Sequence, residues 1–298
     1  MNKENTFRNI TINDIHIVNC IVNTIEKNYL NHKIINILEI GCGSGTFLIF
    51  MMEELLKKFP ETEFNFHAFD IQESELTFTK KGTENIHLMN LHRVLKKKYN
   101  NINWEEKIRL IKDTDNWHSE INFFDIVISN QVLEHVNNKR LFFQKLELCL
   151  KENGNSFHVA PMSSCVLEWH IHVPFAHWFK SKKTLKMYLI IYKLFTCPIK
   201  FLKDRKSMIS YINDRVKYLF EKTHYNSTAE IIEYCNNHNL KVNFTYTYPY
   251  YLLRLCRLFN IDLDKFNFYK SSSVLHHMTF YISERIACIT LHVTKSTK

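Results

Sequence analysis

Three of the five glycines in this 298-residue chain lie within five consecutive positions. They are Gly41, Gly43 and Gly45, in the stretch ILEIGCGSGTF of residues 37–47. Glycine lets the backbone turn sharply and approach a ligand without a Cβ atom in the way. An apolar run precedes these glycines and a helical pattern follows them, so the loop would lie at a helix N-terminus. Free N–H groups and the helix dipole suit a carboxylate or a phosphate there. The alternative is a tight turn that binds nothing.

Two acidic residues accompany this loop. Glu39 precedes the first glycine by two positions, and Asp70 follows the next apolar run, residues 64–69. An acid at that position can accept hydrogen bonds from both hydroxyls of a ribose. The loop spacing is G-x-G-x-G with Thr46 in the sixth position, whereas a dinucleotide-binding loop reads G-x-G-x-x-G. A nicotinamide dinucleotide is therefore a less favoured ligand.

A second group of reactive side chains lies in LEWHIHVPFAHWF, residues 167–179. A neutral imidazole is a natural base for a hydroxyl near neutral pH. The H-x-H spacing can also place two imidazoles on one side, as a metal site requires. No acid or cysteine completes an obvious ligand set, so we expect no metal. The remaining interpretation is a packed aromatic loop. The stretch contains His170, His172, His177, Trp169 and Trp178.

Short apolar runs alternate along the chain with helical patterns. Strands that alternate with helices predict a parallel sheet covered by helices on both faces. The predicted helices are residues 12–30, 47–59, 86–99 and 139–150, and the predicted strands are residues 34–40, 64–69, 108–111, 124–129 and 156–160.

The stretch LEIGCGSG resembles the first motif of class I S-adenosylmethionine-dependent methyltransferases of the small-molecule type, and Asp70 matches the acid of their second motif. Residues 112–136 resemble the stretch that runs from the adenine-contacting acid through the fourth strand. The resemblance covers residues 12–160 and resumes at 227–242 and 286–295. It implies an α/β fold with a Rossmann-like seven-stranded sheet, mostly parallel with the last strand antiparallel.

The resemblance also implies S-adenosylmethionine as the cofactor. Its carboxylate would lie over the helix that begins near Thr46, and Glu39 would face its ammonium group. Asp70 would hold the ribose, while Asp113 and Thr114 would border the adenine. Two departures affect that rim: the interval between the two acids is longer than usual, and Lys112 stands where many relatives have glycine. The implied cofactor-binding residues are Glu39, Gly41, Cys42, Gly43, Ser44, Gly45, Asp70, Ile71, Asp113, Thr114, Asn130 and Gln131.

The acceptor side lacks one motif of nucleic-acid methyltransferases. Enzymes that methylate base amines usually carry an N-P-P-aromatic or D-P-P-aromatic run after strand four, where this chain has SNQV, residues 129–132. We therefore expect O-methylation of a small-molecule, glycan or lipid-linked acceptor. The alternatives are a non-catalytic module that binds S-adenosylmethionine and, suggested only by charge, an RNA methyltransferase. The candidate bases are His170, His177 and His135, the last beside Glu134 in the VLEHV run.

The net charge of +9 is concentrated in one segment. Residues 180–206 contain nine Lys or Arg residues and one Asp. Lys186, Lys193 and Lys200 are seven positions apart and share one helix face, beside apolar residues and a kink at Pro198. Two interpretations remain. One is a lid over the acceptor pocket with its lysines in solvent, and the other is an amphipathic helix in peripheral contact with an anionic membrane.

The sequence predicts a core interrupted by insertions. Residues 1–160 would form the first part of the cofactor-binding core, 161–226 an inserted cap and acceptor region, and 227–298 the rest of the sheet, with a second insertion at about 249–283. The eight cysteines are scattered without a C-x-x-C pair, which favours a reducing, cytoplasmic compartment. The polar N-terminal segment lacks the apolar core of a signal peptide. No run of about 18 uncharged apolar residues predicts a membrane-spanning helix.

Overall fold

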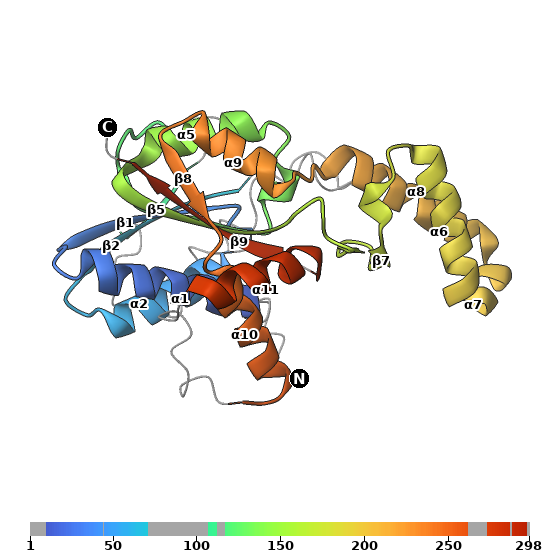
Figure 1. Cartoon of the computed structure of the whole chain (residues 1–298), viewed down its shortest axis with the longest axis horizontal. Coiled ribbons are helices and arrows are strands. Elements are labelled where there is room, and N and C mark those ends of the chain that lie inside the picture. The colour runs from blue at the N-terminus through green and yellow to red at the C-terminus, as the bar shows by residue number, and fades with distance from the viewer. Residues whose placement is uncertain are drawn as a thin grey trace.

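A seven-stranded sheet with helices on both faces forms the centre of the molecule (Figure 1). The computed structural model describes residues 10–43, 45–70, 107–111, 117–261, 273–286 and 288–296. β1 pairs in parallel with β2 and β4, whereas β9 runs antiparallel between β5 and β8. This topology confirms the predicted fold class. The strands in spatial order are β3 (Ile108–Leu110), β2 (Glu63–Phe69), β1 (Ile34–Ile40), β4 (Phe124–Asn130), β5 (Leu150–Pro161), β9 (Cys288–Lys295) and β8 (Leu240–Asn243).

Most strand positions agree with the prediction. β1 has the predicted bounds because its apolar run ends where the glycines begin. β5 is the exception, since it begins at Leu150 although a shorter strand, 156–160, was predicted. Its first residue pairs with Phe124 of β4 ahead of an irregularity in the register. The predicted helix at residues 86–99 lies outside the described residues.

The helices divide between the two faces of the sheet. α1 and α2 cover one face, and α5 and α9 cover the other (Figure 1). Side chains of a strand point alternately to opposite faces. Ile35 and Ile37 of β1 therefore pack toward α1 and α2, while Leu38 and Ile40 pack toward α5 and α9. The helices of this part are α1 (Ile12–Thr24), the π-helical η1 (Ile25–Tyr29), α2 (Thr46–Lys58), the 3-10 turn η3 (Leu133–His135), α5 (Lys139–Cys149), α9 (Thr228–Asn236), α10 (Thr247–Leu258) and α11 (Ser273–Ile286).

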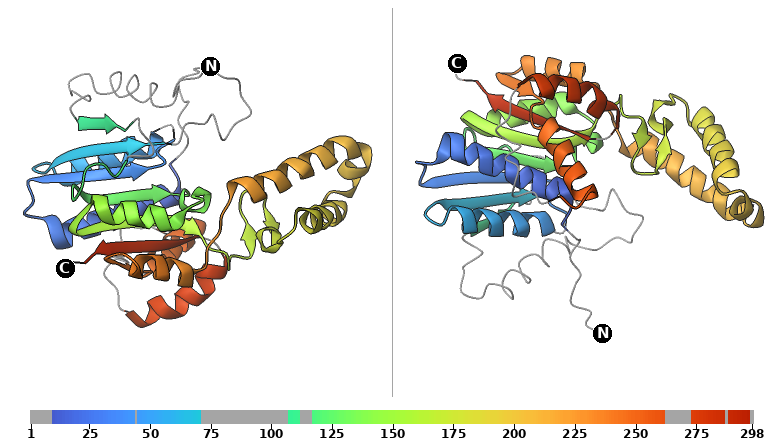
Figure 2. Two further views of the ribbon diagram at one scale, coloured as in Figure 1. Left: turned by 90° about the horizontal axis from the view of Figure 1, so that it is seen from above. Right: turned by 60° about the horizontal axis from the view of Figure 1, so that its bottom comes forward.

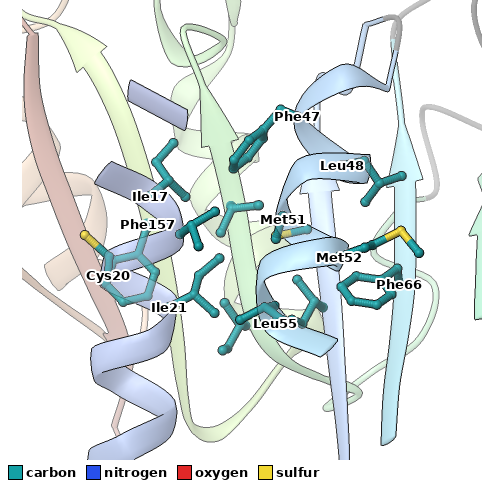
Figure 3. Packing of buried hydrophobic residues seen from close by; sticks show 14 of the residues in the cluster. Ile17, Cys20, Ile21, Phe47, Leu48, Met51, Met52, Leu55, Phe66 and Phe157 are labelled. Carbon is teal, nitrogen blue, oxygen red and sulfur yellow. The ribbon is translucent and has the colours of Figure 1, made fainter. Parts of the chain in front are cut away.

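A dense hydrophobic cluster holds α1 and α2 against the sheet (Figure 3). Ile17 and Ile21 of α1 meet Met51 and Leu55 of α2, and all four side chains are fully buried. Burying a side chain of this size contributes about 1.5–3 kcal/mol. This packing fixes the N-terminus of α2 beside the carboxyl end of β1, where the glycine loop lies.

Between β5 and α9 the chain forms an arm that projects away from the sheet (Figures 1 and 2). The arm has a small hydrophobic core of its own, in which Leu185 and Leu189 pack with Ile212 and Val216. No described helix is long and apolar enough to cross a membrane. The arm comprises β6 (Leu167–Glu168), β7 (Val173–Pro174), η4 (Ala176–Trp178), α6 (Lys182–Thr196), α7 (Pro198–Lys203) and α8 (Arg205–Lys222).

Candidate active site

The glycine loop connects β1 to α2 in a conformation that favours glycine. Gly41, Gly43 and Gly45 have φ angles of +76°, +51° and +78°, a region that other residues rarely adopt. A Cβ atom on Gly41 would lie 2.3 Å from Cγ2 of Val132. Among the described residues, a Cβ atom on Gly43 would meet only Asp70, 3.8 Å away. Gly41 is therefore required by packing, whereas Gly43 leaves an open cradle for a ligand. Cys42 between them is buried, and its backbone N–H donates to the carbonyl oxygen of Phe69 at 3.1 Å.

Two acids border this cradle. The carboxylate of Asp70 accepts a hydrogen bond from the backbone N–H of Gly43. Glu39 is buried, and its Oε2 has no hydrogen-bond partner among the described residues. Burial, together with the charges of Asp14 and Asp70, raises the pKa of Glu39 to about 8. A buried carboxyl oxygen without a partner suits a cationic ligand group. The cradle, Glu39 and Asp70 therefore fit the carboxylate, ammonium and ribose of S-adenosylmethionine.

The end of β4 is tied to the start of α1. Asn130 donates a hydrogen bond to Oδ1 of Asp14 at 2.7 Å and accepts one from Asn13 at 3.2 Å. Gln131, which has a positive φ of 58°, points the other way and donates to Sγ of Cys288 at 3.0 Å. Thus Asn130 lies on the Glu39 side of the sheet, and Gln131 lies toward β9. The other predicted cofactor residues, Ser44, Ile71, Asp113 and Thr114, lie outside the described residues.

The histidine-rich stretch is organised by one buried acid, Glu168. Its Oε1 accepts hydrogen bonds from the backbone N–H of His170 at 2.9 Å and from Nδ1 of His170 at 2.7 Å. The hydroxyl of Tyr225 donates to its Oε2 at 2.6 Å. Nδ1 of His177 lies 3.4 Å from the same oxygen. Glu168 therefore brings together two of the three predicted histidines of this stretch, while the third, His172, is exposed.

The charges of this pair stabilise each other. Burial alone would raise the pKa of Glu168, but the hydrogen bonds from His170 and Tyr225 outweigh it and hold that pKa below its ordinary value. Burial alone would lower the pKa of His170, but the hydrogen bond and charge of Glu168 raise it. His170 therefore holds a proton more readily than an isolated imidazole does.

The third predicted base, His135, joins this group from the turn after β4. The rings of His135 and His170 lie 5.1 Å apart, edge to face. Nδ1 of His135 lies 2.8 Å from the carbonyl oxygen of Lys222, and burial lowers the pKa of His135. Beside it, burial raises the pKa of Glu134 to about 7. We define Glu134, His135, Glu168 and His170 as the acid–histidine cluster.

His177 also faces a cavity at the base of the arm. The cavity has a volume of about 520 Å³ and is lined by residues of the β5–β6 connection, η4 and α8. His177 contacts the ring of Tyr225, with a centroid distance of 4.8 Å. The lining includes Ser163, His177, Trp178, Lys180, Phe220 and Tyr225.

Sequence reasoning missed three contributors to this region. Glu168 and Tyr225 are separated by the whole arm in sequence, so no local spacing announces their contact. Arg254 of α10 lies over the rings of Trp169 and Tyr250, at 5.7 and 5.5 Å, and thereby connects α10 to the histidine-rich stretch. The one signal in the sequence concerned Glu168, an acid that lies two residues before a histidine.

A sheet of this order, whose first strand ends in this glycine loop and whose second ends in an acid, defines a class I S-adenosylmethionine-dependent methyltransferase. A family model described as a methyltransferase domain matches residues 23–243. The chain belongs to this methyltransferase family, and S-adenosylmethionine is its cofactor.

Individual relatives are more distant. Malonyl-[acyl-carrier protein] O-methyltransferase 2 of Ilyobacter polytropus is 27% identical over 124 residues, which is 42% of this chain and 38% of that protein. The match therefore spans less than half of that relative. Phosphoethanolamine N-methyltransferase 2 of Haemonchus contortus, solved with S-adenosylmethionine, has a TM-score of 0.47 at 15% identity, over 93% of this chain and 52% of that one. An S-adenosylmethionine-dependent methyltransferase from Mesorhizobium loti has a TM-score of 0.46 at 9% identity, over 87% and 90%.

Proposed function

We propose that this methyltransferase acts on an oxygen atom of a small-molecule or lipid-linked acceptor. The acid–histidine cluster is the observation that carries this proposal. It lies after β4 and β5, at the end of the sheet where ligands of open α/β folds bind. The relative from Ilyobacter polytropus is by name an O-methyltransferase, which supports the same acceptor atom.

The cofactor would be held by the residues of the cradle. The N–H groups at the start of α2 would bind its carboxylate, because Gly45 at the N-cap has no side chain that could cap the helix. The unpartnered oxygen of Glu39 would accept from its ammonium group, and Asp70 would accept from the ribose hydroxyls. When bound, S-adenosylmethionine supplies a methyl group on a sulfonium sulfur. The chain itself aligns the acceptor oxygen with that methyl group and excludes water.

The cluster would receive the proton that the acceptor loses. A hydroxyl that attacks the methyl carbon must release its proton, and a positioned base raises the rate by roughly 10²- to 10⁴-fold. The carbonyl oxygen of Lys222 can only accept, so Nδ1 of His135 carries the proton and Nε2 remains basic. His170 is oriented in the same way by Glu168. His177, on the cavity wall, is the third candidate.

The arm would contact an anionic membrane surface. Phe195, Ile199 and Leu202 at the far end of the arm are 83%, 70% and 73% exposed. They belong to residues 180–206, a segment that carries eight of the chain's nine net positive charges. An apolar patch ringed by cations matches the interface of an anionic bilayer. The projection of the arm away from the sheet favours this use over a lid.

The acceptor atom can be tested by the stability of the product. The protein would be incubated with S-adenosylmethionine labelled in its methyl group and with fractionated small molecules and lipids. Carboxyl methyl esters release labelled methanol in alkali, methyl ethers keep the label but carry no new charge, and methylated amines remain cationic. A labelled ester or ether supports the proposal. A cationic product, or binding of the cofactor without transfer to any fraction, contradicts it.

A further inference from the structure

Glu134 is a buried carboxylate whose partner is not supplied by the described chain. The residue is 1% exposed, and neither Oε1 nor Oε2 has a hydrogen-bond partner among the described residues. The positive charge of Lys139 acts on Glu134, but its Nζ donates its hydrogen bonds to the carbonyl oxygens of Val136 and His224. A buried carboxylate without a donor is costly unless a cation or a proton compensates it.

Two imidazoles lie beside Glu134, and each has one ring nitrogen in a hydrogen bond and a second ring nitrogen that is available to a ligand. Nδ1 of His135 donates to the carbonyl oxygen of Lys222, and Nδ1 of His170 donates to the carboxylate of Glu168. Since both Nδ1 atoms carry a proton, each Nε2 presents a lone pair when its imidazole is neutral. In the described part of the chain neither Nε2 has a hydrogen-bond partner. Metal-binding histidines are oriented in this way, by a carbonyl or carboxylate on the other ring nitrogen.

The three side chains also converge. One ligand atom from each of Glu134, His135 and His170 lies within 4.8 Å of the others. Ligand atoms about 2 Å from a common ion are roughly 3–4 Å apart. Small side-chain rotations would therefore bring all three into coordination, without movement of η3 or of the connection between β6 and β7.

We propose that Glu134, His135 and His170 bind a divalent cation. Two imidazole nitrogens and one carboxylate form a ligand set typical of Zn²⁺, Fe²⁺, Co²⁺ or Mn²⁺, whereas Mg²⁺ and Ca²⁺ take mainly oxygen ligands. The prediction of no metal considered the histidines of residues 170–177, and the turn after β4 supplies the missing acid and the second imidazole.

The role of the cation rests on the proposed function. Three protein ligands leave at least one coordination position open. An acceptor hydroxyl in that position would lose its proton to water more readily, because a bound cation lowers the pKa of the oxygen it binds. The oxygen then forms a bond to the methyl carbon as the carbon–sulfur bond breaks, and the sulfonium becomes a neutral thioether. His135 and His170 would act as bases in the metal-free protein and as metal ligands in the metal-loaded protein, where the cation would activate the acceptor.

Cobalt titration of the chelator-treated protein tests the site without any methyl acceptor. Wild-type protein should bind one equivalent of Co²⁺, with visible absorption from nitrogen and oxygen ligands. Glu134→Gln and His170→Asn should each weaken Co²⁺ binding at least tenfold. His172→Asn is the matched control, since His172 lies in the same stretch, is exposed, and has a φ of +53° that Asn tolerates.

The same samples separate the possible failures. Binding of S-adenosylmethionine, measured by calorimetry, shows that each protein is folded and leaves the methyltransferase assignment intact. Absence of saturable Co²⁺ binding in such a wild-type sample overturns the metal site, and so does undiminished binding in Glu134→Gln and His170→Asn. If those variants fail to fold, the pulsed EPR spectrum of Mn²⁺ bound to wild-type protein decides. Couplings to imidazole nitrogen support the site, and their absence overturns it.

Discussion

The backbone N–H of Gly43 donates a hydrogen bond to the carboxylate of Asp70, so the loop after β1 and the end of β2 form one unit. The carboxyl ends of the two strands are adjacent because β1 and β2 pair in parallel over their full length. The residue proposed to bind the ribose and the loop proposed to bind the methionine part of the cofactor are thereby held in fixed relation. Changes to either side of this hydrogen bond should affect cofactor binding before they affect folding.

Gly43→Val should abolish binding of S-adenosylmethionine while the protein remains folded. Among the described residues, the nearest atom to a Cβ at position 43 is 3.8 Å away, an ordinary contact, so the added side chain would enter the space proposed for the ligand. The positive φ adds strain of about 1–2 kcal/mol. Calorimetry with S-adenosylhomocysteine checks the loss, and thermal unfolding checks the fold. Binding of NADH with no response to either sulfur compound would contradict the cofactor assignment.

Gly41→Ala should instead destabilise the fold itself. Its Cβ atom would overlap Cγ2 of Val132 at 2.3 Å, and overpacking of this kind costs about 1–3 kcal/mol. The double variant Gly41→Ala/Val132→Ala removes the clashing methyl group and should recover part of that loss. Urea unfolding of the two single variants and the double variant measures the coupling. Strictly additive effects would show that the contact with Val132 is not the cause.

Binding of S-adenosylmethionine at pH 7 should release close to one proton. The pKa of Glu39 is raised to about 8, so this carboxyl is mostly protonated in the free protein at pH 7. It must ionise to accept from the ammonium group of the cofactor. The dependence of the calorimetric enthalpy on the ionisation enthalpy of the buffer gives the number of protons released. Glu39→Gln should release none, and an unchanged value in that variant would assign the proton to another group.

Glu168→Gln should lower the pKa of His170, because the variant removes the negative charge that raises it. In the metal-free protein, NMR titration of the imidazole signals measures this shift directly. The stability that protonated His170 contributes is complete below its ordinary pKa of 6.5 and is lost as the pH rises through its raised value. Glu168→Gln should lose that contribution at low pH. Equal titration of His170 in both proteins would refute the pairing.

Anionic vesicles should bind the protein through the arm, and rising salt should weaken this binding. Replacing Lys186, Lys193 and Lys200 with Gln should reduce the affinity roughly a hundredfold, at about 1 kcal/mol for each lysine near the surface. Phe195→Asn should weaken it further by removing an exposed apolar side chain. Ile121→Asn is the control, since Ile121 is 66% exposed but lies outside the arm. Failure to co-sediment even at low salt would exclude membrane contact.

The sheet was predictable because its strands are short apolar runs with abrupt ends. Residues 34–40 stop at a glycine and residues 64–69 stop at an acid, so sequence and structure agree there within one residue. The loop and the acid proposed to hold the cofactor lie at the same two boundaries. The sequence could not show that Gly41 and Gly43 serve different purposes. In the structure a Cβ atom would meet Val132 at position 41 and Asp70 at position 43.

The acid–histidine cluster was only partly predictable. Histidines 135, 170 and 177 were chosen from residue type, but their orientation depends on Glu168, Tyr225 and the carbonyl oxygen of Lys222. These contacts arise because α8 returns along the arm and places its end beside the β6–β7 hairpin. No periodic pattern carries that information. The two-stranded hairpin itself was not predicted, since each of its strands has two residues.

The position of β9 has a consequence for how the chain acquires its fold. β9 lies between β5 and β8, so among the described strands β8 pairs with β9 alone and cannot join the sheet before β9 does. During synthesis, β1 to β5 emerge first and can pair in order, whereas the edge of β5 stays open until residues 288–295 have been made. Unpaired edges are where partly folded chains associate. β9 therefore completes the sheet at an interior position. A chaperone that covers the edge of β5 until β9 has been made should raise the yield of native protein.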